Sequence, residues 1–164
     1  MKSFLLLLIS FALATSASAQ KIKVEDELIT VDGQPYARIE QDGCGLIDVD
    51  CFYYVKSLQN QRLFVVKQMS FNDPTQVSAS NPQGRQMYLQ YVFTAAKATA
   101  ETSYPATLHL RALDVARKVY KAQLIKDGTL NEQLAADFVT NNGTTYSEHR
   151  RASSQPTIIV VPGH

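Results

Sequence analysis

The 164-residue chain lacks tryptophan, has only two cysteines and carries no marked excess of either charge. Its formal net charge of +1 argues against binding to nucleic acids or anionic membranes through bulk charge. Apolar residues make up 45% of the chain and charged residues 19%, so we do not expect a disordered protein. The length corresponds to one domain, with at most a short tail.

Sequence patterns of catalytic and cofactor sites are also missing. The chain contains no G-x-S-x-G elbow, no H-E-x-x-H motif, no Walker loop and no G-x-G-x-x-G fingerprint. Its cysteines and histidines show neither C-x-x-C nor H-x₃₋₅-H spacing, which argues against a zinc site. Asp48 and Asp50 begin a calcium-loop pattern that Phe52 breaks. We therefore expect no metal and no cofactor, and a protein without catalytic activity is favoured.

A long hydrophobic run is absent, but a short one lies near the N-terminus. Lys2 precedes an uncharged apolar run of 11 residues at 4–14, and a small-x-small pattern follows at 17–19. This arrangement is typical of a secretory signal peptide. The run is too short for a transmembrane helix, which needs about 20 residues. We expect residues 1–19 to be removed, so that the mature chain begins at Gln20, in the periplasm or outside the cell.

The two cysteines predict a disulfide. An even number of cysteines in an exported chain favours pairing. Cys44 and Cys51 would close a loop of 8 residues, and the glycines on both sides of Cys44 permit the tight turn that a disulfide needs. The alternatives are a metal site that joins the thiols to histidines and a Cys–His nucleophile pair, and neither has a local signature.

The first two-thirds of the mature chain predict an antiparallel meander. About five segments are rich in strand-forming residues, at 28–31, 34–40, 51–56, 62–71 and 87–94. An Asp-Gly pair supplies the positive φ of a tight type I′ turn after the first segment. Short connections favour antiparallel neighbours. Both faces of the sheet are partly apolar, so we expect helices on one face and the C-terminal tail, a partner subunit or a ligand on the other.

The last third predicts two helices. Apolar residues recur with a 3.6-residue period at 112–124, and the Asp-Gly pair at 127–128 stops this first helix. A capping box at 129–132 begins the second helix, which ends at the Asn-Gly pair at 142–143. The predicted fold class is therefore α+β, an antiparallel meander of about five strands with two C-terminal helices packed on one face.

The predicted domain spans residues 20–146, and residues 147–164 are expected to form a polar linker and an apolar tail. The tail contains an apolar segment at 157–161. Left exposed, this segment would favour aggregation. We therefore expect it to pair as an edge strand or to dock on the uncovered sheet face, and a disordered end is the alternative.

Aromatic side chains on the predicted strands are the candidate ligand site. Tyrosine presents a flat apolar body and a polar tip, which suits glycans, peptides and other proteins. The candidate ligand-binding residues are Tyr53, Tyr54, Tyr88 and Tyr91, together with the loop at 72–84. The alternative is that these tyrosines belong to the core.

Three stretches of the chain resemble small exported proteins of Bacteroidota. They are residues 28–39, the Gly-Cys-Gly at 43–45 before an aromatic strand, and residues 116–143. The resemblance implies the periplasm or the extracellular space of a bacterium. It transfers no catalytic residue.

These observations favour an exported, non-catalytic module that binds a protein or a glycan of the cell envelope. We expect no nucleic-acid partner and no membrane span in the mature chain. One alternative is a hydrolase of an envelope polymer that uses His109 and a carboxylate such as Asp114. The other is a structural protein that associates with itself through its C-terminal strand.

Overall fold

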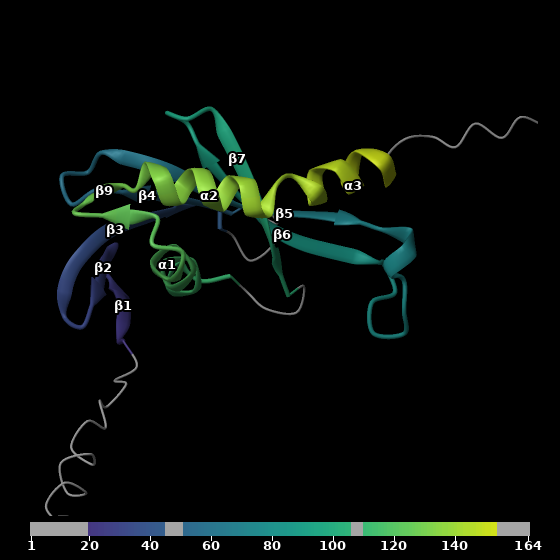
Figure 1. The fold of residues 1–164 in the computed structure, drawn as a ribbon. Coiled ribbons are helices and arrows are strands. Elements are labelled where there is room, and N and C mark those ends of the chain that lie inside the picture. The colour runs from purple at the N-terminus through teal and green to yellow at the C-terminus, as the bar shows by residue number, and fades with distance from the viewer. Residues whose placement is uncertain (1–19, 45–50, 106–109, 154–164) are drawn as a thin grey trace, which may run out of the picture.

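The computed structural model describes residues 20–44, 51–105 and 110–153. Seven strands form one antiparallel sheet in the order β1 to β7 (Figure 1). They are β1 (Ile22–Glu25), β2 (Leu28–Val31), β3 (Gln34–Asp42), β4 (Phe52–Lys56), β5 (Arg62–Asn72), β6 (Arg85–Phe93) and β7 (Ala98–Tyr104). The helical elements are the 3₁₀ turn η1 (Pro74–Gln76) and the helices α1 (Ala112–Lys121), α2 (Glu132–Asn142) and α3 (Thr145–Ser153). The predicted α+β meander is confirmed.

The sheet has two strands more than the sequence predicted. β1 joins β2 through Asp26 and Glu27, which take positive φ values of 46° and 65°. A type I′ turn needs two such residues and normally uses asparagine or glycine, so this turn carries no recognisable signal. β7 has the sequence ATAETSY, in which alanine and glutamate are poor strand formers. By contrast, the turn at Asp32 and Gly33 has the predicted positive φ at both residues.

One face of the sheet carries the main core. Tyr53, Val66, Tyr91 and Ala100 are cross-strand neighbours on four successive strands, and all four are buried. α1 covers this face with the buried side chains of Val115 and Val119. α2 adds Phe138, whose ring centroid lies 4.9 Å from that of Tyr91 and 6.5 Å from that of Phe93. The two predicted helices therefore share one face, which we call the helix face.

The predicted boundary between α1 and α2 is wrong in its details. α1 already ends at Lys121, and Gln123 follows with a left-handed φ of 51°. The Asp-Gly pair at 127–128 instead forms a hairpin turn between β8 (Ile125–Lys126) and β9 (Thr129–Leu130). The N-cap of α2 is Asn131, whose side chain accepts a hydrogen bond from the Leu134 amide at 3.3 Å. Asp127 and Gly128 can end a helix or form a hairpin turn, and residues 129–132 can cap a helix or begin a strand. The pairing of β8 with β9 selects the hairpin.

A third helix, α3, lies on the opposite face of the sheet. The chain reaches it at Gly143, whose carbonyl accepts a hydrogen bond of 3.0 Å from the Glu101 amide at the outer edge of β7. Gly143 has φ 56° and ψ −153°, a conformation that is essentially restricted to glycine. Residues 147–153 therefore belong to a helix and not to a polar linker. The apolar segment at 157–161 lies outside the described residues.

Candidate functional site

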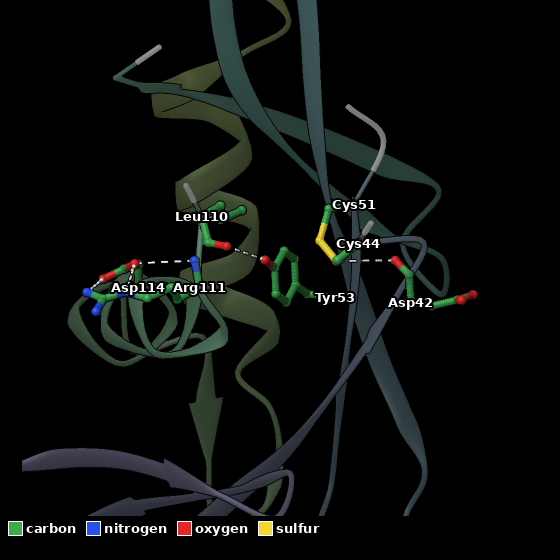
Figure 2. The surroundings of a disulfide bond; sticks show 7 residues. All are labelled: Asp42, Cys44, Cys51, Tyr53, Leu110, Arg111 and Asp114. Carbon is green, nitrogen blue, oxygen red and sulfur yellow. Dashed lines mark hydrogen bonds and ion pairs between the residues drawn. A yellow bond between two sulfur atoms is a disulfide. The ribbon is translucent and has the colours of Figure 1, made fainter. Parts of the chain in front are cut away.

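The predicted disulfide between Cys44 and Cys51 is confirmed. It links the end of β3 to the start of β4, just beyond the paired residues Asp42 and Phe52, and the two Cα atoms are 4.6 Å apart. Cys51 is buried beside Tyr53, and the Tyr53 ring points from β4 toward the start of α1 (Figure 2). The bond therefore closes a hairpin at the border of the core. Among the residues that the structure describes, no group of three His, Cys, Asp or Glu side chains could hold a metal ion.

We expect the double substitution Cys44→Ala and Cys51→Ala to lower the free energy of unfolding by about 2.5 kcal/mol, because the unfolded chain loses the constraint of the closed loop. Urea denaturation of the wild-type protein and the variant measures the difference. Wild-type protein kept reduced by dithiothreitol is the matched control and should lose a similar amount. A loss below about 0.5 kcal/mol in both samples would contradict this role of the disulfide.

The structure does not bring the four candidate tyrosines together. Tyr53 and Tyr91 point to the helix face and are fully enclosed in the core, where they offer no surface to a ligand. Tyr54 and Tyr88 point to the other face, because side chains alternate along a strand. Tyr88 is buried beneath α3, with its ring stacked on that of Tyr146 at 5.2 Å. Of the four, Tyr54 alone is partly exposed.

The Tyr53 side chain helps to hold α1 on the sheet through a hydrogen bond of its hydroxyl group. Its hydroxyl donates a hydrogen bond of 2.9 Å to the carbonyl of Leu110, directly before α1 (Figure 2). Burial raises the pKa of Tyr53 to about 12, and the charges of Tyr104 and Asp114 add to the rise. Tyr53 therefore stays neutral at physiological pH and keeps its proton for the Leu110 carbonyl.

The loop at 72–84 lies far from Tyr54. Val65, the cross-strand neighbour of Tyr54, is seven residues before Asn72, which corresponds to about 24 Å along β5. The loop is tied to itself, since Asp73 accepts a hydrogen bond of 2.9 Å from the Thr75 amide. Gly84 closes it with φ +62°, and a Cβ there would lie 2.1 Å from the Asp73 carbonyl oxygen. Loop and Tyr54 therefore do not form a single site.

A buried polar cluster holds α3 against the sheet, and the sequence did not predict it. The Glu101 carboxylate of β7 is 2% exposed. It accepts hydrogen bonds from the Ser147 amide at 2.9 Å, from the Ser147 hydroxyl, and from Gln90 Nε2 at 3.1 Å. A carboxylate at the first turn of a helix satisfies amide groups that have no partner within the helix. This cluster fixes the path of the chain and is enclosed, so we assign it a structural role.

The part of the second face formed by β4, β5 and β6 combines aromatic, apolar and cationic side chains. Tyr54, Val65 and Val92 form a cross-strand row, and Phe52 pairs with Lys67 beside it. We call the surface formed by these residues and Arg62 the open sheet face, within which Val65 is buried. No described helix crosses it: α3 runs along β5 and β6 (Figure 1), and Tyr146 at its start stacks on Tyr88.

Two cations lie over aromatic rings of the open sheet face. The Arg62 guanidinium carbon is 5.2 Å from the ring centroid of Tyr54, and Lys67 Nζ is 5.7 Å from that of Phe52. Within the described ranges neither cation makes an ion pair with a carboxylate, whereas the neighbouring Lys56 does so with Glu40. Cation–π contacts at exposed sites contribute only about 0.5–1 kcal/mol. Among the described residues, no carboxylate therefore neutralises the positive charge of Arg62 or Lys67.

Of the two residues named for the hydrolase alternative, the structure describes only Asp114. His109 lies outside the described residues. Asp114 Oδ2 is 3.0 Å from Arg111 Nε, and Oδ1 is 3.6 Å from a guanidinium nitrogen of Arg117. The hydrogen bond from Arg111 is the main cause that holds the pKa of the Asp114 carboxyl below its usual range. The Asp114 carboxylate is thus ionised and already paired with two arginines in the first turns of α1.

Comparison with known protein families, with curated proteins and with solved structures finds no match to this chain. None of α1, α2 and α3 combines the length and apolar character that crossing a membrane requires. Function is therefore inferred from the surface of the described chain, and first from the open sheet face.

Proposed function

We propose that this chain is an exported, non-catalytic module that binds an acidic segment of a partner protein on the open sheet face. The observation that carries the proposal is the pair of cations, Arg62 and Lys67, held over aromatic rings without a carboxylate partner in the described structure.

The chemistry of this surface matches that of protein interfaces. Tyrosine and arginine are enriched among the residues that contribute most to binding. A carboxylate of the partner would neutralise Arg62 or Lys67, and apolar side chains beside it would contact the partly exposed Tyr54 and Val92. The aromatic rings hold both cations in place before binding, so little side-chain freedom is lost when the complex forms.

Export rests on two features of different kinds. The N-terminal pattern at 1–19 is that of a signal peptide, and the bond between Cys44 and Cys51 is of the type that persists in oxidising compartments. The periplasm or the extracellular space is therefore the proposed location, in line with the resemblance to small exported proteins of Bacteroidota.

Charge reversal on the open sheet face tests the proposal. The variant Arg62→Glu and Lys67→Glu is compared with Lys21→Glu and Lys126→Glu, which make the same charge change at exposed positions elsewhere. Each protein is immobilised and exposed to envelope extract of the source organism, and the captured proteins are quantified by mass spectrometry. We expect the first variant to retain at least about tenfold less of the partner than wild type, and the control variant to retain as much.

Equal capture by both variants would contradict the use of the open sheet face. Capture of the chain itself, with a dimer mass for the wild type and a monomer mass for the first variant, would instead support self-association. Circular dichroism of both variants shows whether the fold is kept, which we expect because the substituted side chains lie at the surface.

A further inference from the structure

A cavity of about 380 Å³ lies where the start of β3 meets the end of α1 and the hairpin of β8 and β9. This volume falls within the range of about 300–1,000 Å³ that small-molecule sites occupy. The cavity is lined by Tyr36, Tyr120, Gln123, Ile125, Lys126 and Asn131. It lies on the helix face, so a ligand bound there would be independent of a partner on the open sheet face.

A β-bulge turns Tyr36 toward this cavity. The register of β2 and β3 shifts by one residue at this point, which leaves Tyr36 as an extra residue of β3. Its neighbour Ala37 is buried in the core on the helix face, so regular alternation would place Tyr36 on the opposite face. Instead, its ring centroid lies 5.3 Å from that of Tyr120 in α1, and its hydroxyl donates a hydrogen bond of 3.0 Å to the Ile125 carbonyl. Bulges redirect side chains in this way beside functional sites.

A left-handed residue, Gln123, contributes a second side chain to the cavity. α1 ends in a Schellman motif, in which the Gln123 amide donates to the Tyr120 carbonyl at 2.9 Å and the Leu124 amide to the Val119 carbonyl at 3.2 Å. The motif requires a positive φ at residue 123, and Gln123 has φ 51°. Glycine normally takes this position, because a side chain makes the left-handed conformation costly. The chain therefore keeps a less favourable residue here, and that residue adds a side-chain amide to the cavity.

The cavity offers neutral hydrogen-bonding groups beside two partly exposed aromatic rings. Within the described residues, the side-chain amide of Gln123 makes no hydrogen bond, and that of Asn131 uses only its oxygen, which accepts from a backbone amide of α2. Such amides can both donate and accept, as sugar hydroxyls do. Burial raises the pKa of Tyr36 to about 12, so its hydroxyl is neutral at physiological pH. Lys126 is the one charged residue among those that the structure places around the cavity.

We propose that the cavity binds the end of a neutral saccharide chain. A sugar ring would lay its apolar C–H face on the flat surface of Tyr36 or Tyr120. Its hydroxyls would form hydrogen bonds with the side chains of Gln123, Lys126 and Asn131. Water alone would satisfy these polar groups, but it would give no reason for a glutamine at a position where glycine is more favourable.

Titration of the full chain with disaccharides tests this site. Cellobiose, maltose and N,N′-diacetylchitobiose present different neutral sugar rings. Sorbitol is the matched control, because it has the hydroxyls of a sugar but no ring face. Amide chemical shifts in ¹H–¹⁵N spectra follow the binding. We expect saturable shifts at Gln123, Lys126 and Asn131 with at least one disaccharide, and at least about tenfold weaker effects with sorbitol. Shifts that grow linearly with all three disaccharides, or equal binding of sorbitol, would overturn the proposal.

The variant Gln123→Gly separates a binding role from a structural one. Glycine removes the cost of the left-handed backbone, so the melting temperature should rise by about 3 °C. The affinity for the bound disaccharide should fall by about tenfold, because the side-chain amide is lost. Lys97→Gly is the matched control, since Lys97 is also left-handed, with φ 49°, and does not line the cavity. Unchanged affinity in Gln123→Gly, or an equal loss in Lys97→Gly, would contradict the assignment.

Discussion

The substitution Tyr53→Ala is expected to lower the free energy of unfolding by about 4 kcal/mol, whereas Tyr54→Ala should change it by less than about 1 kcal/mol. The two tyrosines are neighbours in β4 and have the same side chain, so they form a matched pair. Tyr53 is fully buried on the helix face and holds the carbonyl before α1. Removing it leaves a large cavity and an unpaired carbonyl, while removing Tyr54 opens no cavity in the core.

Urea denaturation monitored by far-UV circular dichroism measures both changes. The variant Tyr53→Phe separates packing from hydrogen bonding, because it removes only the bond to the Leu110 carbonyl and should cost about 1 kcal/mol. In the envelope capture experiment, Tyr54→Ala should reduce the amount of captured partner more than Tyr53→Ala does, since the Tyr54 ring supports Arg62 on the open sheet face. Similar stability losses for Tyr53→Ala and Tyr54→Ala would mean that β4 is not covered by α1 in the way described.

Local patterns in the sequence were sufficient for most of the sheet. Asp32 and Gly33 identified a type I′ turn, and aromatic and β-branched residues identified β4, β5 and β6. The sequence did not identify β1, because Asp26 and Glu27 form its turn without glycine. The sequence also predicted that both sheet faces are partly apolar. It did not predict α3, because the sequence TYSEHRRAS is polar and lacks a 3.6-residue apolar repeat.

The candidate sites depended on information that no local pattern contains. Period-two alternation places Tyr53 and Tyr54 on opposite faces, but it does not tell which face the helices cover. That choice put Tyr53 and Tyr91 in the core and left Tyr54 at the surface.

The passage of the chain from one face of the sheet to the other depends on Glu101. Between α2 on the helix face and α3 on the opposite face, the chain touches β7 through Gly143. The Glu101 carboxylate then binds the backbone and the side chain of Ser147 in the first turn of α3. Hydrogen bonds to a charged group contribute about 1.5–3 kcal/mol each, and a donor left buried without a partner adds a further cost.

We therefore expect Glu101→Ala to lower the free energy of unfolding by about 3 kcal/mol and to release α3 from the sheet. Hydrogen exchange should increase at the Ser147 amide, and Tyr88, which α3 covers, should become accessible to solvent. Glu101→Gln retains one acceptor oxygen and should lose less than Glu101→Ala. Glu25→Ala removes an exposed carboxylate from β1 and should change stability by less than about 0.5 kcal/mol. Unchanged exchange at Ser147 in Glu101→Ala would show that the stacking of Tyr146 on Tyr88 is sufficient to hold α3, and that the buried carboxylate does not direct the chain across the edge of β7.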